Sequence, residues 1–372
     1  MAETVIVGIS GGVDSAVAAW LLQQQGHDVQ GLFMANWDEQ DDHCTIAQDF
    51  QDARRVAERL GIVLHRVSFA REYRERVFED FLREHRAGRT PNPDVACNRE
   101  IKFGIALAYM SRLGAAHIAT GHYVRLAPVR DGIGLFKAFD ASKDQSYFLH
   151  AVHREALSRT LFPIGGLLKA QVRAIAHEQG LPVFDKPDST GICFIGERPF
   201  REFLARYVKA SPGPIETPEG EVLGEHAGLA FYTLGQRSGL GLGGRRNAKE
   251  APWYVAEKHL HRNALIVVQD PLHPLLMSER FRVGSLAWLA EPPADGAACA
   301  VKTRYRQRDL ACRIEHRDGG LLVHLEHPAR AVTPGQYAVF YDGERCLGGG
   351  VIEDRAASRP IPYNQELLRE VS

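Results

Sequence analysis

A turn rich in glycine and serine near the start of the chain has the residue types of a phosphate-binding loop. The string Ser10–Ser15 (SGGVDS) follows an apolar run typical of a buried strand, Val5–Ile9, and precedes one typical of a helix, Ala16–Leu22. Gly11 and Gly12 let the backbone approach a ligand closely and adopt positive φ. Because a helix start presents unpaired N–H groups, and the serine hydroxyls add donors, we expect this turn to bind a phosphate or pyrophosphate.

The loop differs from two common nucleotide-binding motifs. It has no lysine, which excludes the Gly-x-x-x-x-Gly-Lys-Ser/Thr pattern, and it lacks the Gly-x-Gly-x-x-Gly spacing. The string resembles the pyrophosphate loop of ATP pyrophosphatases, enzymes that split ATP into AMP and pyrophosphate while adenylating a substrate. The alternative is an ordinary glycine turn before a helix, which a Gly-Gly pair alone would favour.

Two of the six cysteines stand next to features that activate thiols. Cys97 precedes a helix predicted over residues 102–113, with Arg99 and Lys102 nearby, and a helix start and cations lower the pKa of a thiol. Cys193 lies in a glycine-flanked loop, also before a predicted helix. For Cys97 alone, an ordinary loop thiol is an equally good interpretation. Two such cysteines behind a nucleotide-activating loop suggest sulfur transfer, in which one thiol carries a persulfide and the other releases its sulfur.

The other four cysteines carry no comparable signal. Cys299, Cys312 and Cys346 lie among apolar residues and are predicted to be small buried hydrophobes, and Cys44 has no obvious role. The cysteines neither form a Cys-x-x-Cys pair that would indicate zinc nor make a disulfide scaffold in a chain of this length. We therefore predict no metal-ligating residues.

The first part of the chain alternates strands and helices. After the first strand, further strands are predicted at residues 29–34, 62–67 and 115–120, with helices between them. This order is typical of an α/β fold with a doubly wound parallel sheet, in which ligands bind beyond the carboxyl ends of the strands. A nucleotide there would have its phosphates on the loop and its base near Met34 and Gly121. From the sequence alone, core packing is the better interpretation of Met34.

The composition changes near Lys209, where prolines and glycines mark a boundary. From there on, short apolar runs separated by glycine and proline are typical of small β-barrels. We predict a catalytic domain over residues 1–208, a central β-rich domain over 209–275, a C-terminal β-barrel over 276–360 and a tail over 361–372.

Composition is that of a soluble globular protein, with 372 residues, 45% hydrophobic and 24% charged. The chain shows neither a membrane-spanning run nor a secretion signal, so we expect a cytoplasmic enzyme without a membrane partner. The net charge of −1 neither supports nor excludes RNA binding. Residues 302–317 form a local positive patch in which Tyr305 could stack on a base, although a solvated barrel face is the alternative.

Several motifs run in order across most of the chain. They are GISGGVDS (8–15), LFMANW (32–37), TPNPDVACN (90–98), ATGHY (119–123), KDQSY (143–147), DSTGICFIG (188–196), YTLGQR (232–237) and TRYR (303–306). In these motifs the chain resembles the bacterial tRNA-specific 2-thiouridylases of the ATP pyrophosphatase superfamily, which make 2-thiouridine at the wobble position (34) of the anticodon. The loop alone identifies the superfamily, whereas the two cysteine motifs together are far more specific.

The resemblance implies a fold and a role for each matching residue. The fold would be an adenine nucleotide alpha hydrolase-like domain, a central β-rich domain and a tRNA-contacting C-terminal barrel. The ATP-binding residues would be Gly8, Ile9, Ser10, Gly11, Gly12, Val13, Asp14, Ser15, Met34 and Gly121. Asn92, Pro93 and Asp94 would meet the target uridine. Contacts to tRNA would come from His122, Lys143, Asp144, Gln145, Arg304, Tyr305 and Gln336. For His122, a packed polar residue at a strand end is the alternative.

The resemblance also implies a mechanism for this sulfurtransferase. The uracil C2 oxygen would attack the α-phosphate of ATP, with magnesium neutralising the phosphates. Cys193 would carry the persulfide, and Cys97 would be the nucleophile that frees its sulfur unless the persulfide attacks directly. The two cysteines would end as a disulfide, and Asp94 would act as an acid, a base or a base-reading group. The implied partners are the anticodon stem-loop of tRNAs for Lys, Glu and Gln, and a persulfide donor, either a sulfur-relay protein or a cysteine desulfurase.

Two other functions remain open at this point. The first is an ATP-dependent amide-forming ligase of the same superfamily, such as argininosuccinate synthetase, which would need no cysteine pair. The second is a non-catalytic RNA-binding protein whose loop senses a nucleotide. Release of pyrophosphate that depends on tRNA would exclude the second.

Overall fold

Five parallel strands form the N-terminal sheet of the computed structural model, which describes residues 3–37, 46–188, 199–242 and 251–357. Their order is β3 (Leu64–Ser68), β2 (Asp28–Ala35), β1 (Thr4–Gly8), β4 (His117–Ala119) and β7 (Thr160–Leu161). All four neighbouring pairs are parallel. The strand order therefore reverses between β1 and β4, which is where such sheets bind ligands. The doubly wound sheet predicted from the sequence is confirmed.

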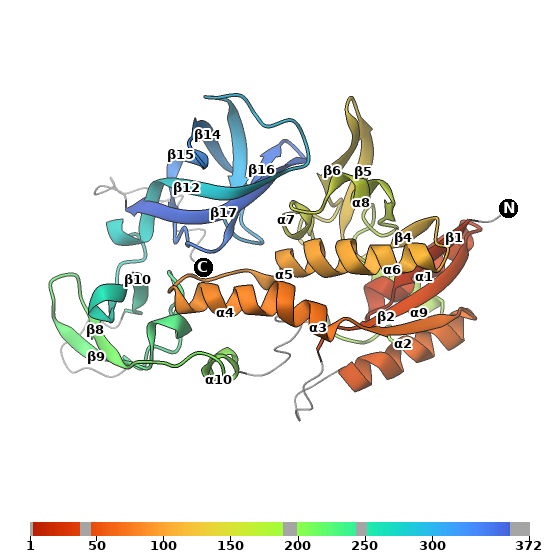
Figure 1. Cartoon of the computed structure of the whole chain (residues 1–372), viewed down its shortest axis with the longest axis horizontal. Coiled ribbons are helices and arrows are strands. Elements are labelled where there is room, and N and C mark those ends of the chain that lie inside the picture. The colour runs from red at the N-terminus through yellow and green to blue at the C-terminus, as the bar shows by residue number, and fades with distance from the viewer. Residues whose placement is uncertain (1–2, 38–45, 189–198, 243–250, 358–372) are drawn as a thin grey trace.

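Helices cover both faces of this sheet (Figure 1). On one face, α1 (Val13–Gln24), α2 (Ile46–Leu60) and α9 (Lys169–Glu178) enclose an apolar cluster that includes Val7 and Val17. On the other face, Ile6 joins a second cluster. Because side chains alternate along a strand, the neighbours Ile6 and Val7 serve opposite faces, and both are fully buried.

Two long helical runs lie on the second face, and each has a π-helical middle. The first consists of α3 (Ala70–Tyr73), η1 (Arg74–Phe78) and α4 (Glu79–Arg86). The second consists of α5 (Pro93–Ala96), η2 (Cys97–Ile105) and α6 (Ala106–Arg112).

The second run corrects our prediction of a helix start at residue 102. Asn92 is the N-cap, and its Oδ1 atom accepts a hydrogen bond from the Asp94 N–H group at 3.2 Å. Proline at the first helical position, here Pro93, favours a helix start because its φ is already fixed near the helical value. Cys97 therefore lies inside the helical run and is only 1% exposed, whereas we had placed it in a loop before the helix.

Two β-rich parts follow the N-terminal domain, as predicted. A four-stranded sheet has the order β10 (Tyr254–His259), β11 (Ala264–Val268), β8 (Gly213–Glu216) and β9 (Val222–His226). The next six strands follow the order β12 (Met277–Trp288), β15 (Gly320–Arg330), β14 (Leu310–Arg317), β13 (Ala298–Lys302), β16 (Tyr337–Asp342) and β17 (Arg345–Ala357). Because β12 also pairs with β17, these strands close a barrel around an apolar core.

One hairpin joins the first domain to this barrel. Strands β5 (Val124–Val129) and β6 (Gly132–Lys137) leave the parallel sheet, and β6 pairs with β17, where Leu135 lies opposite Cys346. Figure 1 shows the hairpin between the N-terminal sheet and the barrel. We did not predict these strands. Their pairing ties the barrel to the domain that carries the glycine-rich loop.

The remaining elements are short. They are α7 (Ser146–Leu149), α8 (Arg154–Ser158), α10 (Phe200–Ala205), η3 (Leu229–Phe231), η4 (Leu260–Arg262) and η5 (Pro274–Leu276). Within the described ranges, the search for a helix with the length and apolarity to cross a bilayer found none.

Candidate functional site

The Ser10–Ser15 turn connects the carboxyl end of β1 to α1, at the point where the strand order reverses. Gly11 has φ +78°, as predicted, whereas Gly12 is extended at φ −102° and ψ 166°, so the positive φ predicted for Gly12 is wrong. Gly12 is the N-cap and has no side chain to cap the first turn of α1. The helix start therefore presents its N–H groups and dipole without a side-chain acceptor, as an anion site requires.

The two serines of the turn have different roles. Ser15 is 4% exposed, and its Oγ atom donates to the Gly12 carbonyl at 3.1 Å and accepts from the Ser10 N–H group at 3.2 Å. Ser10 is exposed, with its Oγ atom 3.3 Å from that of Ser15. Ser15 thus holds the shape of the turn, and Ser10 is the hydroxyl that a ligand can reach.

Two lysines from distant parts of the chain support the turn. Lys169, at the start of α9, donates to both carboxylate oxygens of Asp14 at 2.8 and 2.9 Å. Lys186 donates to the Gly11 carbonyl at 3.0 Å and to Asp49 and Asp52 on α2 at 2.8 and 2.6 Å. The turn itself contains no lysine, and neither Lys169 nor Lys186 was predicted to support it. Their partners lie 155 and 175 residues away, so no local pattern signals them.

Asp188 connects this network to the motif that contains Cys193. Its carboxylate lies 2.8 Å from the cationic groups of Lys143, Lys169 and Arg173. Burial opposes ionisation, but hydrogen bonds from Lys143 and Lys169 prevail and hold the pKa of Asp188 well below its usual range. Residues 189–198, including Cys193, lie outside the described residues, so only the start of that motif is placed, and it is held by three cations.

The predicted ATP-binding residues at the strand ends lie close to the turn. A Cβ atom on Gly8 would lie 3.7 Å from the Met34 side chain, and one on Gly121 would lie 2.7 Å from the Ser15 nitrogen. Only glycine fits at 121, because a side chain there would push into the backbone that starts α1. The strand ends therefore converge on the loop as predicted. Which atoms contact ATP stays a prediction.

The residue after Gly121 leads to the helix of Cys97. The His122 ring lies 5.8 Å from the ring of Phe103 on η2, and its Nδ1 atom lies 2.8 Å from Thr120 Oγ1. Burial, reinforced by Lys102, holds the pKa of His122 well below its ordinary value. His122 is therefore neutral near pH 7. A contact to tRNA, which stays a prediction, would be a hydrogen bond and not an ion pair.

The helical run that begins after Asn92 contains two further predicted site residues, Asp94 and Cys97. Burial raises the pKa of the Asp94 carboxyl, although the charge of Lys102 opposes this shift. Cys97 lies one turn further along, in an apolar cluster and at the first residue of η2. π-Helical turns occur frequently at functional sites. The arrangement offers an unusually basic carboxylate next to a shielded thiol.

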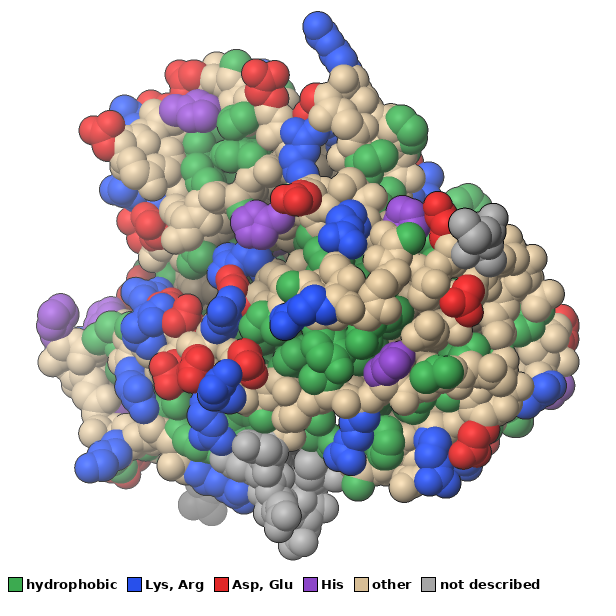
Figure 2. Space-filling view, turned by 45° about the vertical axis from the view of Figure 1, so that its right-hand side comes forward, with side chains coloured by type: hydrophobic (Ala, Val, Ile, Leu, Met, Phe, Trp, Pro, Cys, Tyr) green, Lys and Arg blue, Asp and Glu red, His purple; other side chains and the backbone are tan. Residues whose placement is uncertain are grey.

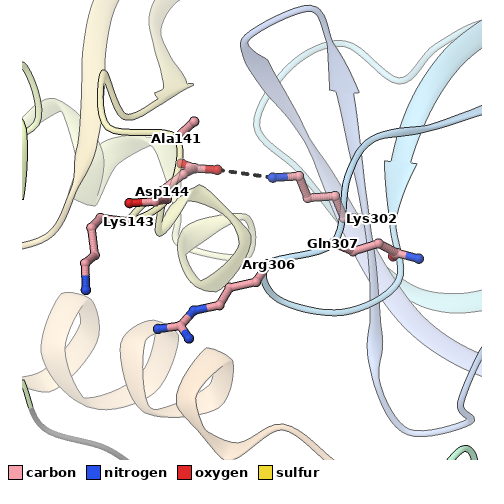
Figure 3. Close-up of a pocket in the computed structure, with 7 residues that line it drawn as sticks. Ala141, Lys143, Asp144, Lys302, Arg306 and Gln307 are labelled. Atoms are coloured by element: carbon pink, nitrogen blue, oxygen red, sulfur yellow. Dashed lines mark hydrogen bonds and ion pairs between the residues drawn. The ribbon is translucent and has the colours of Figure 1, made fainter. Parts of the chain in front are cut away.

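A second polar region lies where the first domain meets the barrel. A cavity of about 420 Å³ is lined by Ala141, Ser142, Lys143, Asp144, Lys302, Arg306 and Gln307. Figure 3 shows the Lys302–Asp144 ion pair spanning it, with Lys143 and Arg306 extending to one side of that pair. On the face drawn in Figure 2, Lys and Arg side chains border a central hydrophobic area.

The three residues of the Lys143–Gln145 motif differ in accessibility. Asp144 is 6% exposed, and its oxygens accept hydrogen bonds from Ala138, Ser146 and Lys302. Gln145 accepts one from the Tyr123 N–H group at 2.9 Å. Lys143 lines the cavity. Contacts of these three residues with tRNA stay a prediction, for which Lys143 has the most suitable position.

The turn between β13 and β14 carries the other predicted tRNA residues, Arg304 and Tyr305. The centroids of the Tyr305 and Phe148 rings are 4.4 Å apart. The Arg306 guanidinium carbon lies over the Tyr305 ring, 5.4 Å from its centroid. Arg306 has φ +62°, a strained conformation for a residue other than glycine, and such strain clusters at functional sites. The positive patch predicted here contains this exposed arginine, which was not among the predicted tRNA contacts.

Gln336 lies between domains. Its Nε2 atom donates to the Thr90 carbonyl at 2.8 Å, and the Thr90 N–H group donates to the Pro334 carbonyl at 3.0 Å. Thr90 Oγ1 also lies 3.3 Å from Thr233 Oγ1 in the middle domain. The segment before Asn92 is therefore held by both other domains. The Gln336 amide thus already has a protein partner. Binding of tRNA by this residue stays a prediction.

Comparison with known proteins covers nearly the whole chain. Three protein-family profiles match in succession: the tRNA methyl transferase HUP domain over residues 3–197, the tRNA methyl transferase PRC-barrel domain over 201–269 and the aminomethyltransferase β-barrel domain over 278–352. The chain is 58% identical to the tRNA-specific 2-thiouridylase MnmA of Marinobacter nauticus, over 94% of this chain and 91% of that protein. The chain belongs to the tRNA-specific 2-thiouridylase family.

Other 2-thiouridylases match to a similar extent. The protein of that name from Cupriavidus metallidurans is 57% identical over 94% of this chain and 99% of its own length. The 2-thiouridylase of Dichelobacter nodosus is 56% identical over 95% of this chain and 95% of its own length. A solved U34-tRNA thiolase from Methanococcus maripaludis is 16% identical over 55% of this chain and 63% of its own, with a TM-score of 0.35, too low to carry an argument. The family resemblance seen in the sequence motifs of this 2-thiouridylase is confirmed.

Proposed function

We propose that the protein is a tRNA 2-thiouridylase that uses ATP to activate the wobble uridine and then replaces the C2 oxygen with sulfur. One observation supports the coupling of these two steps. The glycine-rich loop touches Gly121, and the next residue packs on the helix that carries Asp94 and Cys97. A nucleotide on the loop and a base at Asn92–Asp94 would then lie on one continuous surface.

In the first step, the chain would orient ATP so that the uracil C2 oxygen meets the α-phosphate. Pyrophosphate would leave on the N–H groups at the start of α1, where the helix dipole favours negative charge. Asp94, made more basic by burial, would take the N3 proton as O2 is adenylated. Magnesium would accompany the triphosphate. Asp14 fits poorly as its ligand, because both of its oxygens accept hydrogen bonds from Lys169.

In the second step, sulfur would replace AMP at C2. Cys193 would carry a terminal sulfur supplied as a persulfide by a sulfur-relay protein or a cysteine desulfurase. Either this persulfide attacks C2 directly, or the Cys97 thiolate frees it as hydrosulfide. Both routes leave a Cys97–Cys193 disulfide, which a reductant must open before the next cycle.

The domains would divide this work. Residues 1–208 would hold ATP and both cysteines, while the barrel, over 276–360, would bind the anticodon stem through the turn that carries Arg304 and Tyr305. The central domain, over 209–275, would fix the segment before Asn92 through Thr233. The anticodon loop supplies an unpaired base, so the uridine enters the pocket at less cost than from a duplex.

Separate serine substitutions of Cys97 and Cys193 test this function. Nucleosides from tRNA incubated with ATP, magnesium and a sulfur donor are analysed by mass spectrometry, and pyrophosphate release is followed in parallel. We expect Cys97→Ser and Cys193→Ser to release pyrophosphate only when tRNA is present and to form no 2-thiouridine with a persulfide donor. Cys346→Ser, which changes a buried thiol on β17, is the matched control. Full thiolation by both variants would exclude the sulfur scheme, and tRNA-independent pyrophosphate release would favour an amide-forming ligase.

A further inference from the structure

Two thiols in the barrel, which the proposed mechanism does not use, lie in contact. Strands β13 and β14 are antiparallel, and their register places Cys299 directly opposite Cys312. The two Sγ atoms are 3.5 Å apart. Side chains directly opposite in an antiparallel pair have Cβ atoms about 4.5–5.5 Å apart, and a disulfide needs about 3.5–4.5 Å. Side-chain rotation and a small strand adjustment are therefore enough to join them.

The two thiols differ in accessibility. Cys312 is 1% exposed and belongs to the barrel core, whereas Cys299 is partly exposed at the edge of that core. The hydrogen bond with Cys312 lowers the pKa of the Cys299 thiol, although burial opposes this. Redox-active cysteines combine an accessible thiol of thiolate character with a second thiol placed to resolve its oxidised form. Cys299 and Cys312 fit these two roles.

We propose that Cys299 and Cys312 are a modification site that forms a reversible disulfide across β13 and β14. A peroxide would oxidise Cys299 to the sulfenic acid and be reduced, with release of one water. Cys312 would then attack the Cys299 sulfur, form the S–S bond and release a second water. The two thiols lose two electrons and two protons in total, and both electrons go to the peroxide. A dithiol reductant would restore the thiols by exchange.

The position of the pair gives the bond a structural consequence. Cys299 and Cys312 flank the turn in which Tyr305 packs on Phe148, together with Lys302 at the end of β13, which pairs with Asp144. A disulfide would link the two strands on which this turn is mounted. It would restrict the turn that we propose meets tRNA, and this last consequence alone depends on the proposed function. The disulfide itself can be tested without tRNA.

Peptide mapping of the folded, full-length protein tests the proposal. Trypsin is expected to release Cys299 in peptide 283–302 and Cys312 in peptide 309–313, each with a single cysteine. After treatment with hydrogen peroxide and alkylation of the remaining thiols, we expect a cross-linked product of these peptides, lighter by two hydrogens than their sum. Dithiothreitol should remove it. Cys346, fully buried with its pKa raised to about 12, should stay in the thiol form and serves as the internal control.

Substitutions test whether Cys312 resolves the oxidised form of Cys299 or whether the two thiols react with peroxide independently. In Cys312→Ser, Cys299 should oxidise further to the sulfinic acid and form no cross-link. Cys299→Ser, which leaves the core intact, should protect Cys312 from peroxide. In the oxidised wild type, amide hydrogen exchange in residues 303–309 should slow relative to the reduced protein and to Cys299→Ser. Peroxide that leaves Cys299 as a sulfinic acid in the wild type, or a cross-link that forms only in unfolded protein, would overturn the proposal.

Discussion

The two polar regions of this protein differ in whether their charged side chains are paired with one another. At the nucleotide edge of the sheet, Lys169 pairs with Asp14 and Asp188, and Lys186 pairs with Asp49 and Asp52. At the junction with the barrel, Lys302 is paired but Arg306 is exposed on a strained turn. The first region has a fixed network, and the second keeps a cation available to solvent.

This difference fits the two substrates in the proposed function. A nucleotide must be held in one orientation for attack on its α-phosphate, and a paired network fixes the loop that does this. A tRNA backbone is a long polyanion that is attracted by accessible cations and displaces their counterions. Substitutions in the two regions should therefore affect different steps: nucleotide turnover in the first region and tRNA binding in the second.

Lys169→Met should have the largest effect, because it leaves Asp14 and Asp188 without a shared cation. We expect about a 10- to 100-fold fall in ATP-dependent turnover, with a loss of about 1–3 kcal/mol in unfolding free energy, typical of hydrogen bonds to charged groups. Affinity for tRNA should stay unchanged. Denaturant unfolding, turnover and tRNA binding are the measurements, and exposed Lys209→Met is the control. A tRNA-binding defect with normal turnover would contradict the separation.

Arg306→Ala should act on the other substrate. Losing one phosphate contact should weaken tRNA binding and reduce the slope of log affinity against log salt by about 0.7–0.9. Nucleotide binding measured without tRNA should not change. The control is Arg54→Ala, an exposed arginine on α2 that is paired with Glu58. An unchanged salt slope would remove Arg306 from the tRNA surface.

Gln336→Leu distinguishes a positioning residue from a tRNA ligand. If the amide serves mainly to hold Thr90, kcat should fall about 3- to 10-fold, consistent with about 1 kcal/mol for one hydrogen bond, while the Kd for tRNA stays constant. Gln23→Leu is the matched control, because Gln23 donates a similar bond to the Leu60 carbonyl at 3.0 Å within the first domain. A higher Kd with normal kcat would instead support direct contact with tRNA.

Asp188→Asn should give the smallest effect, and one that depends on pH. Hydrogen bonds from Lys143 and Lys169 lower the pKa of Asp188 in the folded state, so its carboxylate stabilises the fold above the unfolded pKa of about 3.9. This stabilisation is lost as the pH falls through the lower, folded pKa. The variant should therefore melt earlier than the wild type at pH 7, and the difference should shrink below about pH 4. Asp185→Asn, an exposed neighbour, should show no such trend.

The sequence was most informative where structure depends on neighbouring residues. The positive φ of Gly11, the helix after the loop and the alternation of strands with helices follow from local patterns, and the structure bears them out, although α1 begins at Val13 and not at Ala16. The helix start at Pro93 was missed because we gave more weight to the apolar run after Lys102 than to the Asn-Pro cap. The consequence was an incorrect local environment for Cys97.

Features made by distant parts of the chain were not predictable in this way. The hairpin of β5 and β6 pairs with β17, which lies more than 200 residues later in the chain. Lys169 reaches Asp14 across 155 residues, and Gln336 reaches Thr90 across 246. Cys299 and Cys312 were predicted to be buried hydrophobes, which describes Cys312, but their register across two strands only emerges from the fold.

The final position of the uridine C2 oxygen shows whether ATP adenylates the base before sulfur is transferred. A tRNA anticodon stem-loop with ¹⁸O at C2 of the wobble uridine is incubated with enzyme, ATP, magnesium and a sulfur donor, and the released AMP is weighed by mass spectrometry. If that oxygen attacks the α-phosphate on the glycine-rich loop, each AMP should carry one ¹⁸O for every 2-thiouridine formed. Unlabelled AMP with ¹⁸O in the water would contradict the account.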